Sequence, residues 1–304
     1  MQKKWFLARF ATFFSWWNFL PVFSYHEVSL VWHAGEIRNR GAKHDEGRQM
    51  RRNPWTIVGI TLPALIIASY THEIISPVSG YEWLHSHQPF YIAESIDKVL
   101  GVVVCVFAMW LMYRTDLRGT SRELGLSAPV LPAIAFGLVA SLPMLIGFAV
   151  TRNVNPHIDI VSLLFLTVFS PLVEEIEFRG FGVLQLQRGT GWPFWIVVWP
   201  SALLFGLGHV EQGESLEEML GLFLLTGAGG VTFAWLVYRW QNLWVATALH
   251  VVTNLWWRLF SVSKNAIGGW FPFAVQNLTM VLAILITLCR TEPRRAALSS
   301  DSAR

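Results

Sequence analysis

The sequence predicts an all-α protein, a polytopic transmembrane helical bundle of about eight spans that an N-terminal interfacial amphipathic helix precedes. Of the 304 residues, 53% are hydrophobic and only 14% are charged, whereas about a quarter of an ordinary soluble domain is charged. The mean hydropathy is +0.43. The charged residues gather in 36–52, 114–123 and 290–304. Between these clusters lie apolar stretches of about 18 residues, which is the length that crosses a bilayer.

The first 54 residues are expected to be a lead-in to the membrane domain. Residues 3–23 begin with Lys3 and Lys4 and then carry aromatic and apolar side chains at helical spacing. Arg9 interrupts the apolar run, and no small-residue cleavage site follows it. This pattern favours a helix lying in the membrane interface over a signal peptide. The rest of the lead-in is basic and is expected to be cytoplasmic.

Residues 55–290 form the expected membrane domain, and a polar cytoplasmic tail, 291–304, follows it. Prolines and glycines lie inside several spans, for example Pro63, Pro200 and Gly227. Such residues are tolerated where neighbouring helices satisfy the freed backbone groups, so we expect a packed bundle with kinks. The expected spans are 55–76, 97–113, 129–150, 159–186, 192–210, 217–238, 242–260 and 269–289.

The distribution of lysine and arginine indicates the orientation. These residues are frequent in the lead-in and in 114–128, whereas 77–96 and 211–216 have none. Because cytoplasmic loops are enriched in them, both termini are expected to face the cytoplasm. The connection 258–268 departs from the pattern, since it is expected to be external but carries an arginine and a lysine.

The net charge of +3 does not indicate a nucleic-acid partner, because the basic residues flank apolar segments, as in membrane proteins. Membrane lipid is the expected surrounding, and the absence of long soluble insertions fits a bacterial inner membrane. Cys105 and Cys289 both lie in apolar runs. They are expected to be buried small hydrophobic residues rather than disulfide partners or metal ligands.

An acidic cluster is the most informative segment. Four charged residues fall within the six positions 174–179, directly after an apolar run. A charged residue at the centre of a membrane helix costs about 2.5–3.5 kcal/mol, so such residues are retained where they face a polar cavity and serve a function. The alternative is that the helix leaves the membrane near Ser170 and the charges form a solvated turn.

Helical geometry sorts these charges. Glu175 and Arg179 are four residues apart, in the order that favours an ion pair. Glu174 lies about 100° further around the helix. One glutamate can therefore be neutralised by the arginine while the other stays available as a general base. Glu174 is the candidate base, and Glu175 with Arg179 would hold it in place.

Two further polar sites lie in expected spans. His209 ends the run Phe194–Leu207, and His250 and Asn254 share one face of the span 242–260. With the acidic cluster, they resemble the motifs of the CAAX prenyl endopeptidase and bacteriocin-processing (CPBP, or Abi) family of intramembrane proteases, E-E-x-x-x-R, F-x-x-x-H and H-x-x-x-N. The resemblance covers roughly 129–260. The three motifs occur in order as Glu174-Glu175…Arg179, Phe205…His209 and His250…Asn254.

This resemblance implies an all-helical fold with a central cavity and the hydrolysis of a peptide bond in a protein or peptide substrate, membrane-associated or lipidated. Glu174 and His209 would activate water. His250 and Asn254 would stabilise the oxyanion, a role that suits two donors one helical turn apart. For Glu174 and His209 to meet, the fourth helix must be long.

Three alternatives remain open at this stage. The resemblance favours a mechanism without a cofactor, but a glutamate and two histidines also suit catalytic zinc, with Glu174, His209 and His250 as candidate ligands. A second alternative is a membrane scaffold or peptide-immunity protein that binds a peptide without cleaving it. A third is a transporter whose buried carboxylates relay protons, although no inverted repeat is visible.

Overall fold

The computed structural model describes residues 53–291, except 79 and 262–267. The chain divides into two compact units, 1–51 and 52–304, and only the second contains described residues. The expected interfacial helix and the tail from 292 onward lie outside them. The described residues form helices, and their single isolated bridge joins Val154 to Phe260. The predicted all-α class is confirmed.

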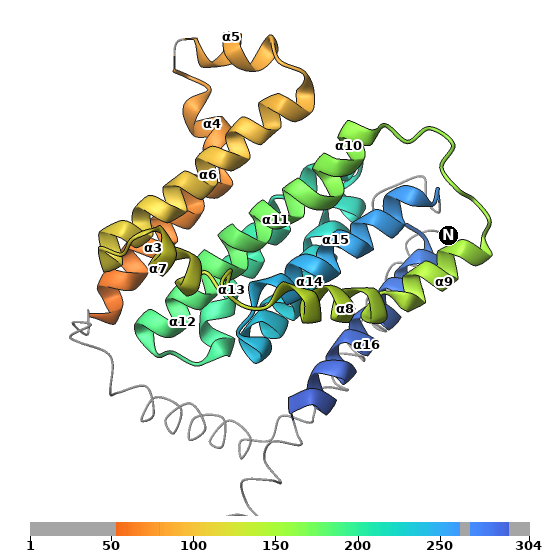
Figure 1. The fold of residues 1–304 in the computed structure, drawn as a ribbon. Helices are drawn as coiled ribbons and strands as arrows, with labels where there is room; N and C mark the ends of the chain where they lie inside the picture. The colour runs from red at the N-terminus through yellow and green to blue at the C-terminus, as the bar shows by residue number, and fades with distance from the viewer. Residues whose placement is uncertain (1–52, 79, 262–267, 292–304) are drawn as a thin grey trace, which may run out of the picture. The chain divides into compact units, whose positions relative to one another are not determined.

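The helices follow one another along the chain with short connections (Figure 1). They are α3 (Pro54–Ser69), α4 (Thr71–Ile75), α5 (Tyr81–Ser86), α6 (Phe90–Tyr113), α7 (Leu117–Glu123), α8 (Val130–Ala140), α9 (Leu142–Val150), α10 (Ile160–Leu164), η2 (Phe165–Phe169), α11 (Ser170–Glu174), η3 (Glu175–Val183), α12 (Leu184–Thr190), α13 (Phe194–Leu207), η4 (Val210–Gln212), α14 (Leu216–Trp240), α15 (Leu243–Leu259) and α16 (Trp270–Thr291).

Polar caps in the sequence set the ends of the helices that carry the site. The Asp159 carboxylate accepts a hydrogen bond of 2.6 Å from the Ser162 amide and starts α10. Gln241 ends α14 in the left-handed conformation, with φ 50°. The side chain of the next residue, Asn242, accepts from the Trp244 amide and starts α15. The chain therefore reverses within two residues, which returns α15 alongside α14.

Length and composition allow four of the described helices to cross a membrane: α6, Phe194–Gln212, α14 and Trp270–Arg290. The pair α8 and α9, bent by 41°, would make a fifth span. With 16 and 17 residues, α3 and α15 are short for a bilayer. The membrane bundle is thus confirmed in the described part of the chain, while the count of eight spans stays a prediction.

The fourth expected span is a long helix that runs without a break from Ile160 to Thr190. In it, two π-helical stretches, η2 and η3, join α10, α11 and α12. Each π-helical turn is wider than an α-helical turn and changes the direction in which the following side chains point. Glu174 is the last residue of α11, near the middle of this long helix. The length that the site requires is therefore present.

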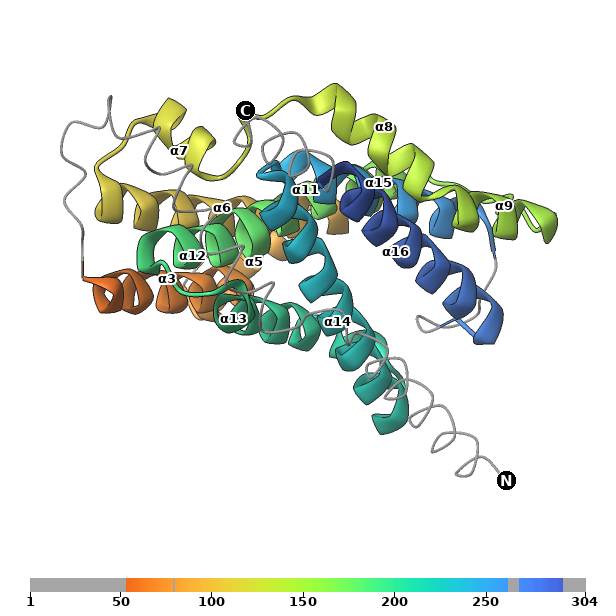
Figure 2. The same cartoon turned by 90° about the horizontal axis from the view of Figure 1, so that it is seen from below.

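The long helix lies in the middle of the described bundle and contacts α3, α6, α13, α14 and α15 (Figures 1 and 2). Small residues let its neighbours approach one another closely. A Cβ atom on Gly206 of α13 would lie 2.9 Å from the Phe223 carbonyl oxygen of α14. One on Gly137 of α8 would lie 2.9 Å from the Ala248 backbone of α15. Glycine at these positions is what brings the helices together.

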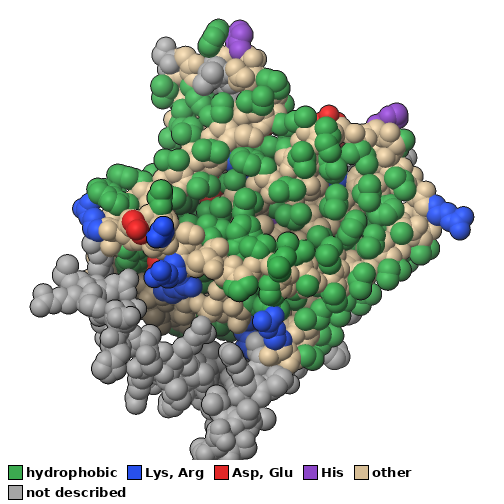
Figure 3. Space-filling model, viewed as in Figure 1, with side chains coloured by type: hydrophobic (Ala, Val, Ile, Leu, Met, Phe, Trp, Pro, Cys, Tyr) green, Lys and Arg blue, Asp and Glu red, His purple; other side chains and the backbone are tan. Residues whose placement is uncertain are grey.

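The outer surface is apolar, as expected for a protein in lipid. Figure 3 shows hydrophobic side chains over most of one face, with lysine and arginine largely at the edge near α7 and the end of α16. Exposed apolar residues include Leu131, Ile146 and Val150. Of the two cysteines, Cys105 is buried as predicted, whereas Cys289 is exposed, because it lies on the outward face of α16.

Candidate active site

The charged stretch of the long helix is buried. Glu175 is 0% exposed, Arg179 1% and Glu177 6%. The alternative of a solvated turn at Glu174–Arg179 is therefore wrong, since the helix continues through this stretch into the core. Five neighbouring helices surround it, so its charges must find partners inside the protein.

Glu175 pairs with two side chains. The Arg179 Nη1 atom lies 3.1 Å from Glu175 Oε1, which is the ion pair that the spacing predicts. The Nδ1 atom of His250 lies 2.8 Å from the same oxygen. Glu175 thus fixes the ring of His250 while Arg179 balances its charge. A carboxylate that holds a histidine ring from behind is a common way to orient an acid–base group.

Aromatic rings enclose the Arg179 guanidinium. Its Cζ atom lies 4.1 Å from the centre of the Phe205 ring and 5.5 Å from that of Phe233. Faces of aromatic rings attract cations, and here they replace the water that the guanidinium would otherwise need. Phe205, the first residue of the second motif, therefore supports the first motif directly.

Glu174 faces another direction and has its own partners. The Lys98 ammonium donates to Glu174 Oε1 at 3.1 Å, and the Ser170 hydroxyl donates to the same oxygen at 2.6 Å. The other oxygen, Oε2, lies 3.9 Å from His250 Nε2. At this distance the two atoms do not form a hydrogen bond with each other. His250 therefore lies between the two glutamates.

His209 follows the end of α13 and is partly buried. Its Nδ1 atom lies 2.7 Å from the Phe205 carbonyl oxygen. Because a carbonyl only accepts, Nδ1 carries the hydrogen, and in a neutral ring Nε2 then keeps its lone pair. The His209 and His250 rings flank the Phe205 ring, with centroid distances of 4.5 and 6.4 Å. His209 is also close enough to interact electrostatically with Glu174.

Asn254 lies one turn after His250 on α15. Its side-chain amide donates to the Leu166 carbonyl oxygen at 3.0 Å. Leu166 is in the π-helical stretch η2, where carbonyls lose their regular α-helical partners. Asn254 thus ties α15 to the long helix two turns ahead of Glu174. An amide group has two hydrogens, and its expected part in binding the oxyanion stays a prediction.

Sequence reasoning missed Lys98, Ser170 and Glu177 as neighbours of the site. The signal for Lys98 was available, since it is the one lysine or arginine in 53–113 and ionisable residues in spans are often functional. Its partner could not be known, because 76 positions separate it from Glu174. Ser170 is simply one helical turn before Glu174.

Glu177 lies one turn after Glu174 and is packed against α6. A Cβ atom on Gly101 would lie 2.3 Å from Glu177 Oε1 and 3.0 Å from the Ala68 carbonyl oxygen. Only glycine leaves room there. The contact sets how closely α6 approaches the long helix, and therefore also where Lys98 of α6 lies.

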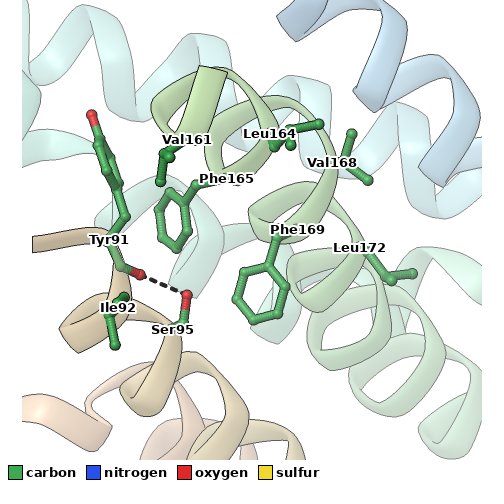
Figure 4. Close-up of a pocket in the computed structure, with 9 residues that line it drawn as sticks. All are labelled: Tyr91, Ile92, Ser95, Val161, Leu164, Phe165, Val168, Phe169 and Leu172. Atoms are coloured by element: carbon green, nitrogen blue, oxygen red, sulfur yellow. Dashed lines mark hydrogen bonds between the residues drawn. The ribbon is translucent and has the colours of Figure 1, made fainter. Parts of the chain in front are cut away.

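An apolar groove of about 350 Å³ opens between the start of α6 and the first half of the long helix. Figure 4 shows its lining, in which the rings of Tyr91, Phe165 and Phe169 are prominent. One further lining residue, Ser95, lies one turn before Lys98 on the same face of α6. The groove thus lies along the same pair of helices as the Lys98–Glu174 ion pair.

The zinc alternative requires Glu174, His209 and His250 to converge on one ion. Among the residues that the structure describes, no group of three or more His, Cys, Asp or Glu side chains is arranged to hold a metal. In addition, two donors already occupy one oxygen of Glu174. As they are arranged, these three side chains do not form a set of metal ligands.

A bundle of membrane helices that encloses two glutamates, two histidines and a balancing arginine defines a polytopic membrane protein with a cluster of ionisable side chains among its helices. Residues 156–256 match the family model described as type II CAAX prenyl endopeptidase Rce1-like. This match and the relative described next confirm that the chain resembles the CPBP family of membrane proteases in the segment that carries the three motifs.

The relative is the protein named "Putative membrane peptidase YdiL" of Bacillus subtilis (strain 168). The two chains are 25% identical over an alignment of 182 residues, and the match covers 53% of this chain and 70% of that protein. No solved structure matches the chain. Lys98 lies outside the segment 156–256 that matches the family model.

Proposed function

We propose that the protein is an intramembrane endopeptidase that cleaves a membrane-associated or lipidated protein or peptide with a water molecule activated by Glu174 and His209. The observation that carries the proposal is the position of His250. One of its nitrogens contacts Glu175, and the other faces Glu174 Oε2 at 3.9 Å. The site thus has one Glu174 oxygen, Oε2, to which Lys98 and Ser170 do not donate. The His250 ring is fixed opposite this oxygen.

The chemistry follows from these positions. Water between Glu174 and the histidines gives up a proton to the carboxylate as its oxygen attacks the carbonyl carbon of the peptide bond. His209 keeps an acceptor nitrogen free because its Nδ1–H is bound to the Phe205 carbonyl. His250 and Asn254 are the proposed donors to the oxyanion; because His250 Nδ1 already donates to Glu175, its Nε2 donates only when the ring is doubly protonated. Glu174 then returns the proton to the departing amine.

The substrate class is inferred from the surroundings of the site. The groove between α6 and the long helix is lined almost entirely by apolar side chains, several of them on the exposed surface of the helices. Such a groove suits an apolar chain that arrives from the lipid rather than from water. We therefore propose that the substrate has an apolar or lipidated segment next to the bond that is cleaved.

The test uses the purified full-length protein in detergent and two internally quenched peptides. One carries a farnesylated cysteine three residues before its C-terminus, and the other is the same peptide without the lipid. The wild type should cleave, with preference for the lipidated peptide, and Glu174→Gln should lower kcat by about 10²–10⁴-fold. The exposed Arg118→Met is the control and should cleave normally.

Equal turnover by the wild type and Glu174→Gln would contradict the proposal, as would cleavage of neither peptide by the wild type. Tight binding of a peptide that the wild type never cleaves would support the scaffold or immunity function instead.

A further inference from the structure

Two donors hold one oxygen of Glu174 and leave the other to the site. The Lys98 ammonium and the Ser170 hydroxyl both donate to Oε1, at 3.1 and 2.6 Å. Oε2 faces His250 Nε2 at 3.9 Å. A carboxylate can rotate about its last torsion, and both of its oxygens are equivalent in a free side chain. In this protein Lys98 and Ser170 make them different.

Lys98 is itself held in place by acidic neighbours and by the packing of α6. Glu174, Glu177 and Glu94 are the acidic groups that interact with its charge. Gly101, one turn further along α6, lets Glu177 approach so closely that a Cβ atom there would be 2.3 Å from its Oε1 atom. The Lys98 side chain is 25% exposed and the Glu174 side chain 15%. The ion pair is therefore at the border of the buried region.

We propose that Lys98 is a positioning residue of the reaction, which acts through Glu174. By binding Oε1, it turns Oε2 toward the histidines, so that water bound to Oε2 lies where His209 and His250 can also contact it. The inference rests on the proposed function. It adds a residue from α6, a helix outside the segment 156–256 that matches the family model.

A misplacement of a reacting group by about 1 Å can lower a rate by about 10²-fold. In Lys98→Met, Glu174 keeps only Ser170 as a donor to Oε1, and the carboxylate is free to rotate. We expect kcat on the quenched peptides to fall by about 10²-fold, with KM unchanged, because no contact to the substrate is lost. Lys98→Arg restores the charge and should recover most of kcat. Arg118→Met removes an exposed cation and should leave both constants unchanged.

If Lys98 served only to stabilise the fold, kcat per folded molecule of Lys98→Met would stay at the wild-type value. Only the melting temperature of that variant would fall. That result would overturn the inference, as would a loss of kcat that Lys98→Arg does not restore. Should Lys98→Met fail to fold, Lys98→Met with Glu177→Gln removes one buried acid together with the cation. The same loss of kcat is expected in that variant, and wild-type kcat would overturn the inference.

A stability cycle tests the ion pair without any substrate. Lys98→Met leaves the Glu174 charge without its cation, so it should lower the melting temperature, and adding Glu174→Gln should restore part of the loss. If Lys98→Met lowered the melting temperature equally in the wild type and in Glu174→Gln, the two residues would not be coupled. That result would overturn the inference. If Glu174→Gln alone cleaves the peptides at the wild-type rate, the proposed function fails, whatever the stability cycle shows.

Discussion

The Nδ1 atom of His250 lies 2.8 Å from Glu175 Oε1, although 75 positions separate the two residues in the chain. This contact joins the first motif to the third and fixes the direction in which the other ring nitrogen points. It depends in turn on Arg179, which balances the charge of Glu175 at 3.1 Å. The predictions below start from this arrangement.

Arg179→Met should destabilise the fold strongly. The substitution leaves Glu175, which is 0% exposed, as a buried charge whose cation is missing. Removal of one partner from a buried pair lowers the free energy of unfolding by about 3–5 kcal/mol. A thermal melt of the purified protein in detergent measures the effect, and Arg118→Met on the surface is the matched control. Equal melting temperatures for the two variants would contradict the buried pair.

Gly101→Ala should disturb the packing of α6 on the long helix. The added methyl group would lie 2.3 Å from Glu177 Oε1 and 3.0 Å from the Ala68 carbonyl oxygen, so the buried Glu177 carboxyl group has to move and the α3 backbone limits the room that is left. Overpacking of this kind costs about 1–3 kcal/mol of unfolding free energy. Gly59→Ala in α3 is the control, since a Cβ atom there meets nothing within 4 Å. A melting temperature of Gly101→Ala at or above that of the control would argue against the contact.

Asn254→Ala separates two roles for this amide. Loss of a donor to the oxyanion should lower kcat by about 10²–10³-fold. Loss of the bond to the Leu166 carbonyl should lower the free energy of unfolding by about 1–3 kcal/mol, since that carbonyl would be left without its partner. We expect both changes, measured by peptide cleavage and by thermal melting. Reduced stability with unchanged kcat would restrict Asn254 to holding α15 on the long helix.

Zinc chelators should leave peptide cleavage unchanged. The proposed mechanism uses the carboxylate of Glu174 and the rings of His209 and His250 directly, with no metal to polarise the carbonyl. The measurement is turnover of the quenched peptides before and after dialysis against a strong chelator. Loss of turnover that added Zn²⁺ restores would show that the three residues act as ligands instead.

The sequence predicted the local pairing in the site correctly, because both partners lie close together on one helix. Glu175 and Arg179 are four residues apart and form the expected pair. The continuous helix through Glu174 was expected as well, since a short one would have separated Glu174 from His209. Apolar composition likewise identified the all-α membrane class.

Contacts between helices lay outside what spacing can predict. Glu174 was expected to be available, yet Lys98 from α6 and Ser170 hold one of its oxygens. The π-helical stretches η2 and η3 were not foreseen either, although Pro171, which follows η2 and has no amide hydrogen, marks a break in the regular hydrogen bonds there. They alter side-chain directions, so the angle of about 100° between Glu174 and Glu175, which assumes a regular α-helix, could be only a first approximation.

The most direct measurement compares two neighbouring acids of the same helix. Glu174→Gln and Glu177→Gln each replace one carboxyl group by an amide, one helical turn apart, but of these two glutamates Glu174 is the one with an oxygen that faces His250. Both proteins should be folded in detergent, and their cleavage of the farnesylated peptide is compared with that of the wild type. We predict a fall in kcat of about 10²–10⁴-fold for Glu174→Gln and a much smaller change for Glu177→Gln. Full turnover by folded Glu174→Gln, or an equal loss in both variants, would contradict the assignment of Glu174 as the catalytic base.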